Sequence, residues 1–199
     1  MKFWADLAVE TLRSPQDAAA RIMGWRVPRT ELYIALLAVS AMTALIVGTV
    51  STLGPPPDQE LLDAVPVLAL FQRPLALFVL TAGGLIVMVH ALYWAGHAMG
   101  GQGDLGDLIA LMAWLQGLRV AAQLVILALS ALVPGVAGLL ALVVMIVAFW
   151  LMLHFISAAL RLGSLWRAFG ILIAVSAGLL LGLMLIITLF GLAGGVSNV

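Results

Sequence analysis

The chain has 199 residues, of which 64% are hydrophobic and only 9% are charged, and its nine basic and nine acidic side chains give zero net charge. A soluble domain is usually about 45–50% apolar and about 25% charged. Even a soluble domain of about 150 residues buries only about 70% of the surface that its unfolded chain exposes, so a soluble fold could not hide this much apolar surface. The composition therefore excludes a soluble globular domain, a disordered tail and a nucleic-acid-binding protein, and it predicts an integral membrane protein.

Residues 1–30 are predicted to form a separate cytoplasmic segment of two short amphipathic helices that lie on the membrane interface. Asp6 and Glu10 interrupt the apolar stretch, which excludes a secretory signal peptide because that needs an unbroken apolar centre. Ser14 is expected to be the N-cap of the second helix, with Pro15 at its first position. Helices of this kind lie in the plane of the interface with the apolar face toward the lipid. The alternative interpretation of the same surface is a docking site for another protein.

Residues 31–199 are predicted to form a membrane domain with five apolar segments, each of the roughly 20 residues that a helix needs to cross the hydrocarbon core. Pro134-Gly135 separates the third segment from the fourth so closely that these two must form an antiparallel hairpin. The predicted spans are residues 32–53, 75–95, 108–133, 136–160 and 168–192. The expected fold class is therefore an all-α integral membrane protein, with five transmembrane helices preceded by short amphipathic interfacial helices.

Basic residues in the short flanks predict the orientation, because they accumulate on the cytoplasmic side of a membrane. The first loop instead carries Asp58, Glu60 and Asp63. With five spans, the N-terminal segment and the link between the fourth and fifth spans lie on the same side. We therefore expect the N-terminus in the cytoplasm and the C-terminus outside. The basic residues of the cytoplasmic side are Lys2, Arg13, Arg21, Arg26, Arg29, Arg161 and Arg167.

A glycine-rich stretch before the third span matches the G-x-G-x-x-G pattern of dinucleotide-binding folds, with Gly101, Gly103 and Gly106. That motif requires a preceding strand, a βαβ unit and an acidic residue about 20 positions further on. Here an apolar helix precedes the glycines, and the stretch that follows holds Arg119 in place of an acid. The pattern therefore predicts a tight cytoplasmic turn without nucleotide binding, and it predicts Asp104 as the N-cap of the third span.

Arg119 is the charged side chain expected near the middle of a span, where an ionised group costs about 2.5–3.5 kcal/mol or more. Gln116, Arg119 and Gln123 follow i, i+3, i+7 spacing and share one face of the third span. Because lipid offers no partner, this face is expected to point into the bundle or into a water-filled cavity. It predicts either a site for an anionic headgroup or a substrate carboxylate, bound by the planar guanidinium group, or an internal hydrogen-bonded contact between helices.

His90 and His154 are expected at similar depth in the second and fourth spans, and they join Gln116, Arg119 and Gln123 as a candidate intramembrane polar site. The pattern favours buried, hydrogen-bonded histidines over a metal site, because there is no H-E-x-x-H motif and no glutamate within a span. The lack of cysteine excludes thiolate ligands and thiolate nucleophiles. We therefore expect no catalytic residue, no metal and no cofactor.

With these segments placed, the whole chain resembles the Yip family, the Ypt/Rab-interacting proteins, and within it the bacterial branch. The resemblance rests on the amphipathic start with Ser14-Pro15, on the glycine-rich stretch from Gly100 to Leu105, and on Phe149-Trp150 in the fourth span. The link before the last span, residues 160–168, also looks like that of the family. The resemblance implies the five-span fold, a bacterial cytoplasmic (inner) membrane and a scaffold or membrane-shaping role, and it carries over no catalytic residue.

Taken together, these patterns favour a non-enzymatic integral membrane protein with a scaffold, membrane-organising or accessory-subunit role. Its expected partners are membrane lipids and either another membrane protein or further copies of the chain, with no nucleic acid and no nucleotide. The alternative hypothesis is a small transporter, or a carrier that binds a lipid or an anion through Arg119 in the third span.

Overall fold

The computed structural model describes residues 2–53 and 73–196. These residues form seven helices, and neither of the two ranges contains a strand. The predicted acidic loop with Asp58, Glu60 and Asp63 lies outside the described residues. The helices are α1 (Lys2–Arg13), α2 (Pro15–Met23), α3 (Arg29–Leu53), α5 (Pro74–Ala98), α6 (Leu105–Ser130), α7 (Pro134–Ala159) and α8 (Leu165–Val196).

Five of these helices, α3, α5, α6, α7 and α8, are long and apolar enough to cross a membrane. The predicted all-α membrane fold with five transmembrane helices is therefore confirmed. Each long helix begins one to three residues before the predicted span: α3, α6 and α8 include polar residues in their first turns, whereas α5 and α7 begin at a proline. The third span was predicted to end at residue 133, whereas α6 ends at Ser130 because residues 131–133 form the turn into α7.

Proline marks the start of three helices: Pro15, Pro74 and Pro134 lie in the first turns of α2, α5 and α7. The fixed φ of proline suits this position, and its missing N–H is not needed there. Ser14 is the N-cap residue of α2, as predicted, although its side chain makes no capping hydrogen bond. Its backbone carbonyl accepts the first hydrogen bond of the helix, from the amide of Ala18 at 3.1 Å, as an N-cap carbonyl does.

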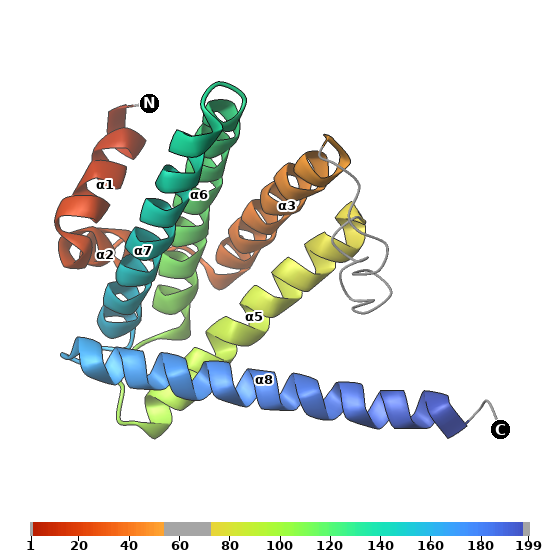
Figure 1. Cartoon of the computed structure of the whole chain (residues 1–199). Helices are drawn as coiled ribbons and strands as arrows, with labels where there is room; N and C mark the ends of the chain where they lie inside the picture. The colour runs from red at the N-terminus through yellow and green to blue at the C-terminus, as the bar shows by residue number, and fades with distance from the viewer. Residues whose placement is uncertain (1, 54–72, 197–199) are drawn as a thin grey trace.

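The long helices are packed tightly at one end and spread apart toward the other (Figure 1). α6 and α7 form the predicted antiparallel hairpin, α3 packs against α5 and α6, and α8 packs against α5 and α7. The core lies at the end where α3, α6 and α8 begin and where α5 and α7 finish. Fully buried side chains at this end are Leu36, Leu92, Leu108, Ile109, Phe155, Ile156 and Ile171.

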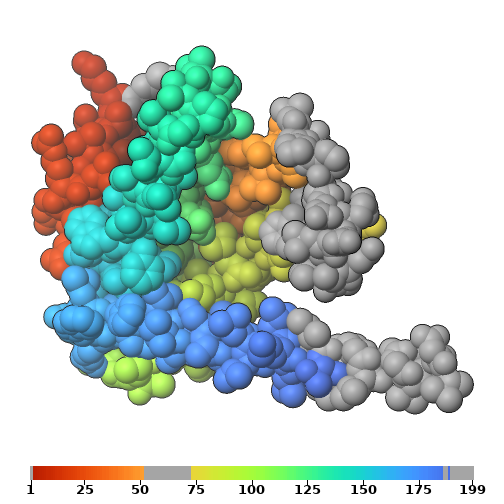
Figure 2. All heavy atoms as spheres, in the orientation of Figure 1, coloured from red at the N-terminus to blue at the C-terminus, as the bar shows by residue number. Residues whose placement is uncertain are grey.

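The second half of α8 leaves this core. Ala168, Ile171 and Val175, in the first turns of the helix, are buried, whereas every residue from 180 to 185 is exposed. Figure 1 shows α8 running away from the other long helices, and in Figure 2 its blue spheres lie along the lower side of the molecule. A Cβ atom added to Gly182 would meet no atom within 4 Å. Within one copy of the chain, residues 180–185 of α8 therefore have no helix packed closely against them among the described residues.

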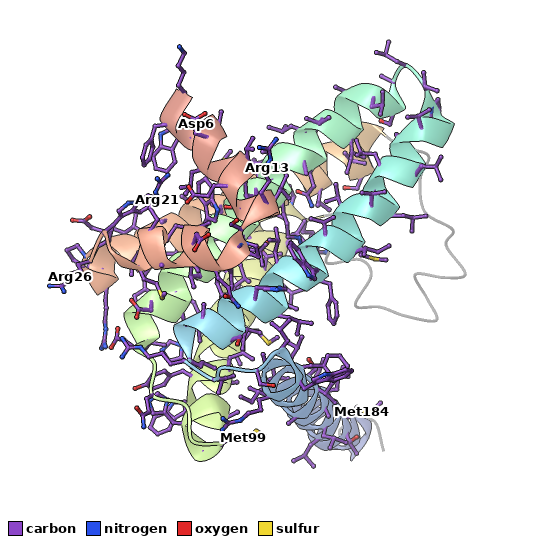
Figure 3. All side chains as sticks on the ribbon, turned by 90° about the vertical axis from the view of Figure 1, so that its left-hand side faces the viewer. Asp6, Arg13, Arg21, Arg26, Met99 and Met184 are labelled. Carbon is purple, nitrogen blue, oxygen red and sulfur yellow. The ribbon has the colours of Figure 1, made fainter. Side chains whose placement is uncertain are left out.

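The two short N-terminal helices pack on the hairpin. α2 lies against α6 and α7 and buries Ala18, Ala19 and Ile22. α1 crosses the hairpin (Figure 3) and buries Leu7 and Thr11. The two predicted helices are present, but α6 and α7 cover part of the apolar surface that the sequence assigned to lipid. Their position on the membrane interface and the division at residue 30 stay predictions.

Candidate functional site

Arg119 lies on the surface of the α6–α7 hairpin, although the sequence led us to expect it inside the bundle or in a water-filled cavity. Its side chain is exposed. Nη1 donates a hydrogen bond to Oε1 of Gln116 at 3.4 Å, a long contact that stays within α6. A guanidinium group carries five N–H donors. Most of the hydrogen-bonding capacity of Arg119 therefore remains available to an acceptor from outside the chain.

Two adjoining grooves meet at Arg119. The smaller one, of about 270 Å³, lies between α6 and α7 and is also lined by Ala8 and Leu12 of α1. The larger one, of about 450 Å³, is formed by α6 and α7 and includes Gln123. Apart from Arg119 and Gln123, every side chain that lines the two grooves is apolar. The residues common to both grooves are Leu115, Arg119, Val144 and Ala148.

The side-chain oxygen of Gln123, in the larger groove, is buried and lacks a hydrogen-bond partner among the described residues. A buried acceptor without a donor costs about 1–3 kcal/mol. Buried polar atoms almost always have a partner, so an exception calls for a physical explanation. The spacing of Gln116, Arg119 and Gln123 placed this side chain on the face of Arg119, but only the packing of α7 shows that its oxygen is buried.

His90 is half-buried between α3 and α5, away from Arg119. Its Nδ1 lies 2.8 Å from the carbonyl oxygen of Ile86, and its Nε2 lies 3.1 Å from the hydroxyl group of Tyr33. The Tyr33 and His90 rings are stacked with centroids 6.1 Å apart. Sequence reasoning missed Tyr33. The available signal was that Tyr33 lies near the predicted start of the first span and His90 in the last part of the second, so that both lie toward the same end of two consecutive spans.

His154 makes its recorded contacts within α7. Its Nδ1 lies 2.9 Å from the carbonyl oxygen of Trp150, and the two rings lie 4.5 Å apart. The five candidate residues therefore occupy three places: one around Arg119, one at His90 and one at His154. Throughout the described ranges, no three His, Cys, Asp or Glu side chains come together in a group that could hold a metal ion.

The glycine-rich stretch packs against the end of α7. Gly101 and Gly103 are buried, and a Cβ atom added to Gly103 would clash with the backbone oxygen of Ala159. The amide of Gln102 donates a hydrogen bond to the carbonyl oxygen of Leu160 at 3.1 Å. The glycines therefore allow two pieces of backbone to approach each other.

Asp104 caps α6, as the sequence predicted. One carboxylate oxygen accepts a hydrogen bond from the amide of Gly106 at 2.6 Å, and the other pairs with Nη2 of Arg29 at 2.8 Å. Partial burial raises the pKa of Asp104, but the hydrogen bonds from Gly106 and Arg29 and the charge of Arg29 outweigh it, so the net pKa is lowered. The pair ties the start of α3 to the start of α6, a link that the sequence analysis did not identify.

Arg167, at the start of α8, ties three segments together at the same end of the bundle. Nη2 donates to the carbonyl oxygen of Met99 at 2.5 Å, and Nη1 donates to that of Leu162 at 3.3 Å. The chain turns sharply on both sides of this contact, with positive φ at Gly100 and Gly163. Arg167 therefore fixes the first turn of α8 relative to the end of α5.

A family model described as Yip1 domain matches residues 9–187 of the chain. The matched range begins within α1, includes the glycine-rich stretch and the Arg119 grooves, and reaches into the exposed half of α8. No curated protein and no solved structure shows a significant match to the chain.

Proposed function

We propose, because the chain belongs to the Yip1 domain family, that it is a non-enzymatic integral membrane protein that organises other membrane proteins. In this proposal it acts as a scaffold or accessory subunit in the bacterial cytoplasmic membrane, with its N-terminus in the cytoplasm and its C-terminus outside. Its partner is another membrane protein or a further copy of the chain.

The exposed half of α8 is the observation that carries this proposal. Leu180, Leu181, Leu183, Met184 and Leu185 expose between 55% and 67% of their surface. With Gly182, which is also exposed, they make six consecutive residues, and these reach all sides of the helix because consecutive residues of an α-helix point about 100° apart. A span without a neighbouring helix can gain packing only from another protein, since lipid chains fit a helix surface less closely than helices fit each other. The position of α8 therefore supports a role in assembly.

The polar residues also support a non-catalytic role. Tyr33 pairs with His90, Asp104 pairs with Arg29, and Arg167 binds backbone carbonyl groups. These interactions join helices to each other. The alternative, a small transporter or carrier, has less support because the candidate polar residues are divided among three separate places.

Site-directed crosslinking tests the proposal directly. The natural sequence contains no cysteine, so Leu181→Cys introduces a single attachment point for a thiol-linked photocrosslinker in native membranes. We expect a protein adduct of one defined mass, either with a second copy of the chain or with one other membrane protein. Leu139→Cys, on an exposed part of α7, is the matched control and should label lipid alone. Lipid adducts alone at both positions would contradict the proposal.

Topology is tested separately with reporter fusions. A fusion placed after Val199 should report the outside and a fusion before Met1 should report the cytoplasm. If both reporters lie on the same side, the chain does not cross the membrane with five helices.

A further inference from the structure

We propose that the grooves beside Arg119 bind one anionic phospholipid whose headgroup carries hydroxyl groups, as phosphatidylglycerol does. The lipid would be a bound component of the fold, so this inference does not depend on the scaffold proposal.

The positive charge of Arg119 has no anionic partner among the described residues. Neither ion pair recorded among the described residues includes Arg119: one joins Arg21 to Glu10 and the other joins Arg29 to Asp104. The planar guanidinium group matches two oxygens of a phosphate at once, and it holds its positive charge at every physiological pH. A phosphodiester placed at the junction of the grooves would supply both the missing counter-charge and the missing acceptors.

The buried side-chain oxygen of Gln123 lacks a hydrogen-bond donor among the described residues. Gln123 lies one helical turn beyond Arg119 and lines the same groove. A phosphodiester at neutral pH has acceptors but no donor, so the phosphate alone cannot satisfy this oxygen. A hydroxyl group attached close to the phosphate can donate to it while the phosphate contacts Arg119. The two side chains together therefore favour a headgroup with both an anionic phosphate and a hydroxyl group.

The remaining lining of the grooves suits acyl chains. Beside Arg119 and Gln123, the larger groove is lined by Met145, Phe149 and Met152 of α7. Beside Arg119, the smaller groove is lined by Ala8 and Leu12 of α1. Pockets for small ligands usually have volumes of about 300–1,000 Å³. The combined volume of the two adjoining grooves, of about 270 and 450 Å³, falls in this range. A lining with one cation, one amide and otherwise apolar surface fits an amphiphile better than a water-soluble anion.

Native mass spectrometry of the full chain in mild detergent tests the inference with three lipids that have the same dioleoyl chains. Phosphatidylglycerol has the charge and the hydroxyl groups, phosphatidylmethanol has the charge alone, and phosphatidylcholine has neither a net charge nor a hydroxyl group. We expect the wild-type chain to bind phosphatidylglycerol best and phosphatidylcholine least. Arg119→Leu should weaken phosphatidylglycerol binding about tenfold, to the level of phosphatidylcholine, which corresponds to about 1.4 kcal/mol.

Two further variants and one control separate the contributions. Gln123→Leu should lower phosphatidylglycerol binding to the level of phosphatidylmethanol and leave phosphatidylmethanol binding unchanged. Ala148→Phe places a large side chain in both grooves and should weaken the binding of all three lipids. Arg73→Leu removes a cation that lines neither groove and should change nothing. Circular dichroism and gel filtration establish that each variant is folded before its lipid binding is compared.

Two results would overturn the proposal. If folded Arg119→Leu binds phosphatidylglycerol as well as the wild type does, the anion site is elsewhere. If phosphatidylmethanol binds the wild type as well as phosphatidylglycerol does, no hydroxyl group contacts Gln123. Arg119→Lys keeps the charge but loses the planar group. If Arg119 contacts a phosphate, the Arg119→Lys variant should bind phosphatidylglycerol more weakly than the wild type and more tightly than Arg119→Leu.

Discussion

The hydroxyl group of Tyr33 in α3 lies 3.1 Å from Nε2 of His90 in α5, although the two residues are 57 positions apart in the sequence. The other ring nitrogen, Nδ1, lies 2.8 Å from the carbonyl oxygen of Ile86, which can only accept a hydrogen bond. In the neutral ring Nδ1 therefore carries the proton and Nε2 accepts from Tyr33. Backbone groups within a span are already paired inside their own helix, so side-chain bonds of this kind fix α3 against α5.

Tyr33→Phe should lower the free energy of unfolding in detergent by about 0.6 kcal/mol and by no more than about 1.7 kcal/mol, the range measured for side-chain hydrogen bonds between membrane helices. The ring keeps its packing, and only the bond to His90 is lost. Tyr93→Phe is the matched control, because no hydrogen bond of the Tyr93 hydroxyl group is recorded in the described structure. Equal effects of the two substitutions on chemical unfolding would show that the pair does not join the helices.

Gly103→Ala should be strongly destabilising, because the added Cβ atom would collide with the backbone of Ala159 at the end of α7. Overpacking a tight contact costs about 1–3 kcal/mol, so we expect a lower thermal midpoint and a larger aggregated fraction in gel filtration. Gly138→Ala is the control, since a Cβ atom there would meet nothing within 4 Å. That substitution should leave stability unchanged or raise it, because alanine favours a helix over glycine by up to about 1 kcal/mol.

Asp104→Ala should remove both the cap of α6 and the ion pair with Arg29, and the loss of a cap alone costs about 0.5–2 kcal/mol. Asp104→Asn keeps a side-chain acceptor for the amide of Gly106 but loses the charge, so it should be less destabilising. The ranking is checked by equilibrium unfolding at neutral pH. If Asp104→Asn is as unstable as Asp104→Ala, the cap does not contribute as the geometry indicates.

The contribution of Asp104 should also depend on pH. Its pKa is lowered in the folded protein, so its stabilising effect is fully present above the unfolded value of about 3.9. The effect is lost as the pH falls through the lower folded value, because the carboxyl group then takes up a proton and no longer pairs with Arg29. The stability difference between wild type and Asp104→Asn should therefore be constant from about pH 5 to about pH 7, because pH 5 is already about one unit above the unfolded value. The difference should shrink in stronger acid. A difference that grows in acid would contradict the lowered pKa.

Thr11→Val should loosen α1 from the hairpin. The indole N–H of Trp114 donates to Oγ1 of Thr11 at 3.0 Å, and Thr11 is completely buried. Valine keeps the shape but leaves the N–H group without an acceptor, at a cost of about 1–3 kcal/mol. We expect faster amide hydrogen exchange throughout α1. In Thr43→Val, the hydroxyl group that is lost bonds only to the carbonyl oxygen of Val39 in its own helix, so exchange in α1 should not change.

The elements of this fold could be predicted because their causes are local. The length of each apolar segment predicts a span, Pro74 and Pro134 mark helix starts, and Asp104 was placed correctly as a cap. Ser14 was also placed correctly as the N-cap residue of α2, although its side chain makes no capping hydrogen bond. The candidate polar site was less predictable. Spacing along α6 places Gln116, Arg119 and Gln123 on one face. It cannot show that His90 contacts the hydroxyl group of Tyr33, or that His154 contacts the carbonyl oxygen of Trp150.

By itself, the sequence with 64% hydrophobic and 9% charged residues determined that the chain lies in a membrane as an all-α protein with five apolar helices. These properties depend on residues close together in the chain and on the thickness of the bilayer. Only the tertiary structure decided that Arg119 faces outward between two grooves, that Gly103 lies against α7, and that α8 leaves the bundle after its first turns. The reason is that these features depend on which helices become neighbours. That choice is made by the packing of side chains far apart in the sequence, which hydrophobic periodicity does not encode.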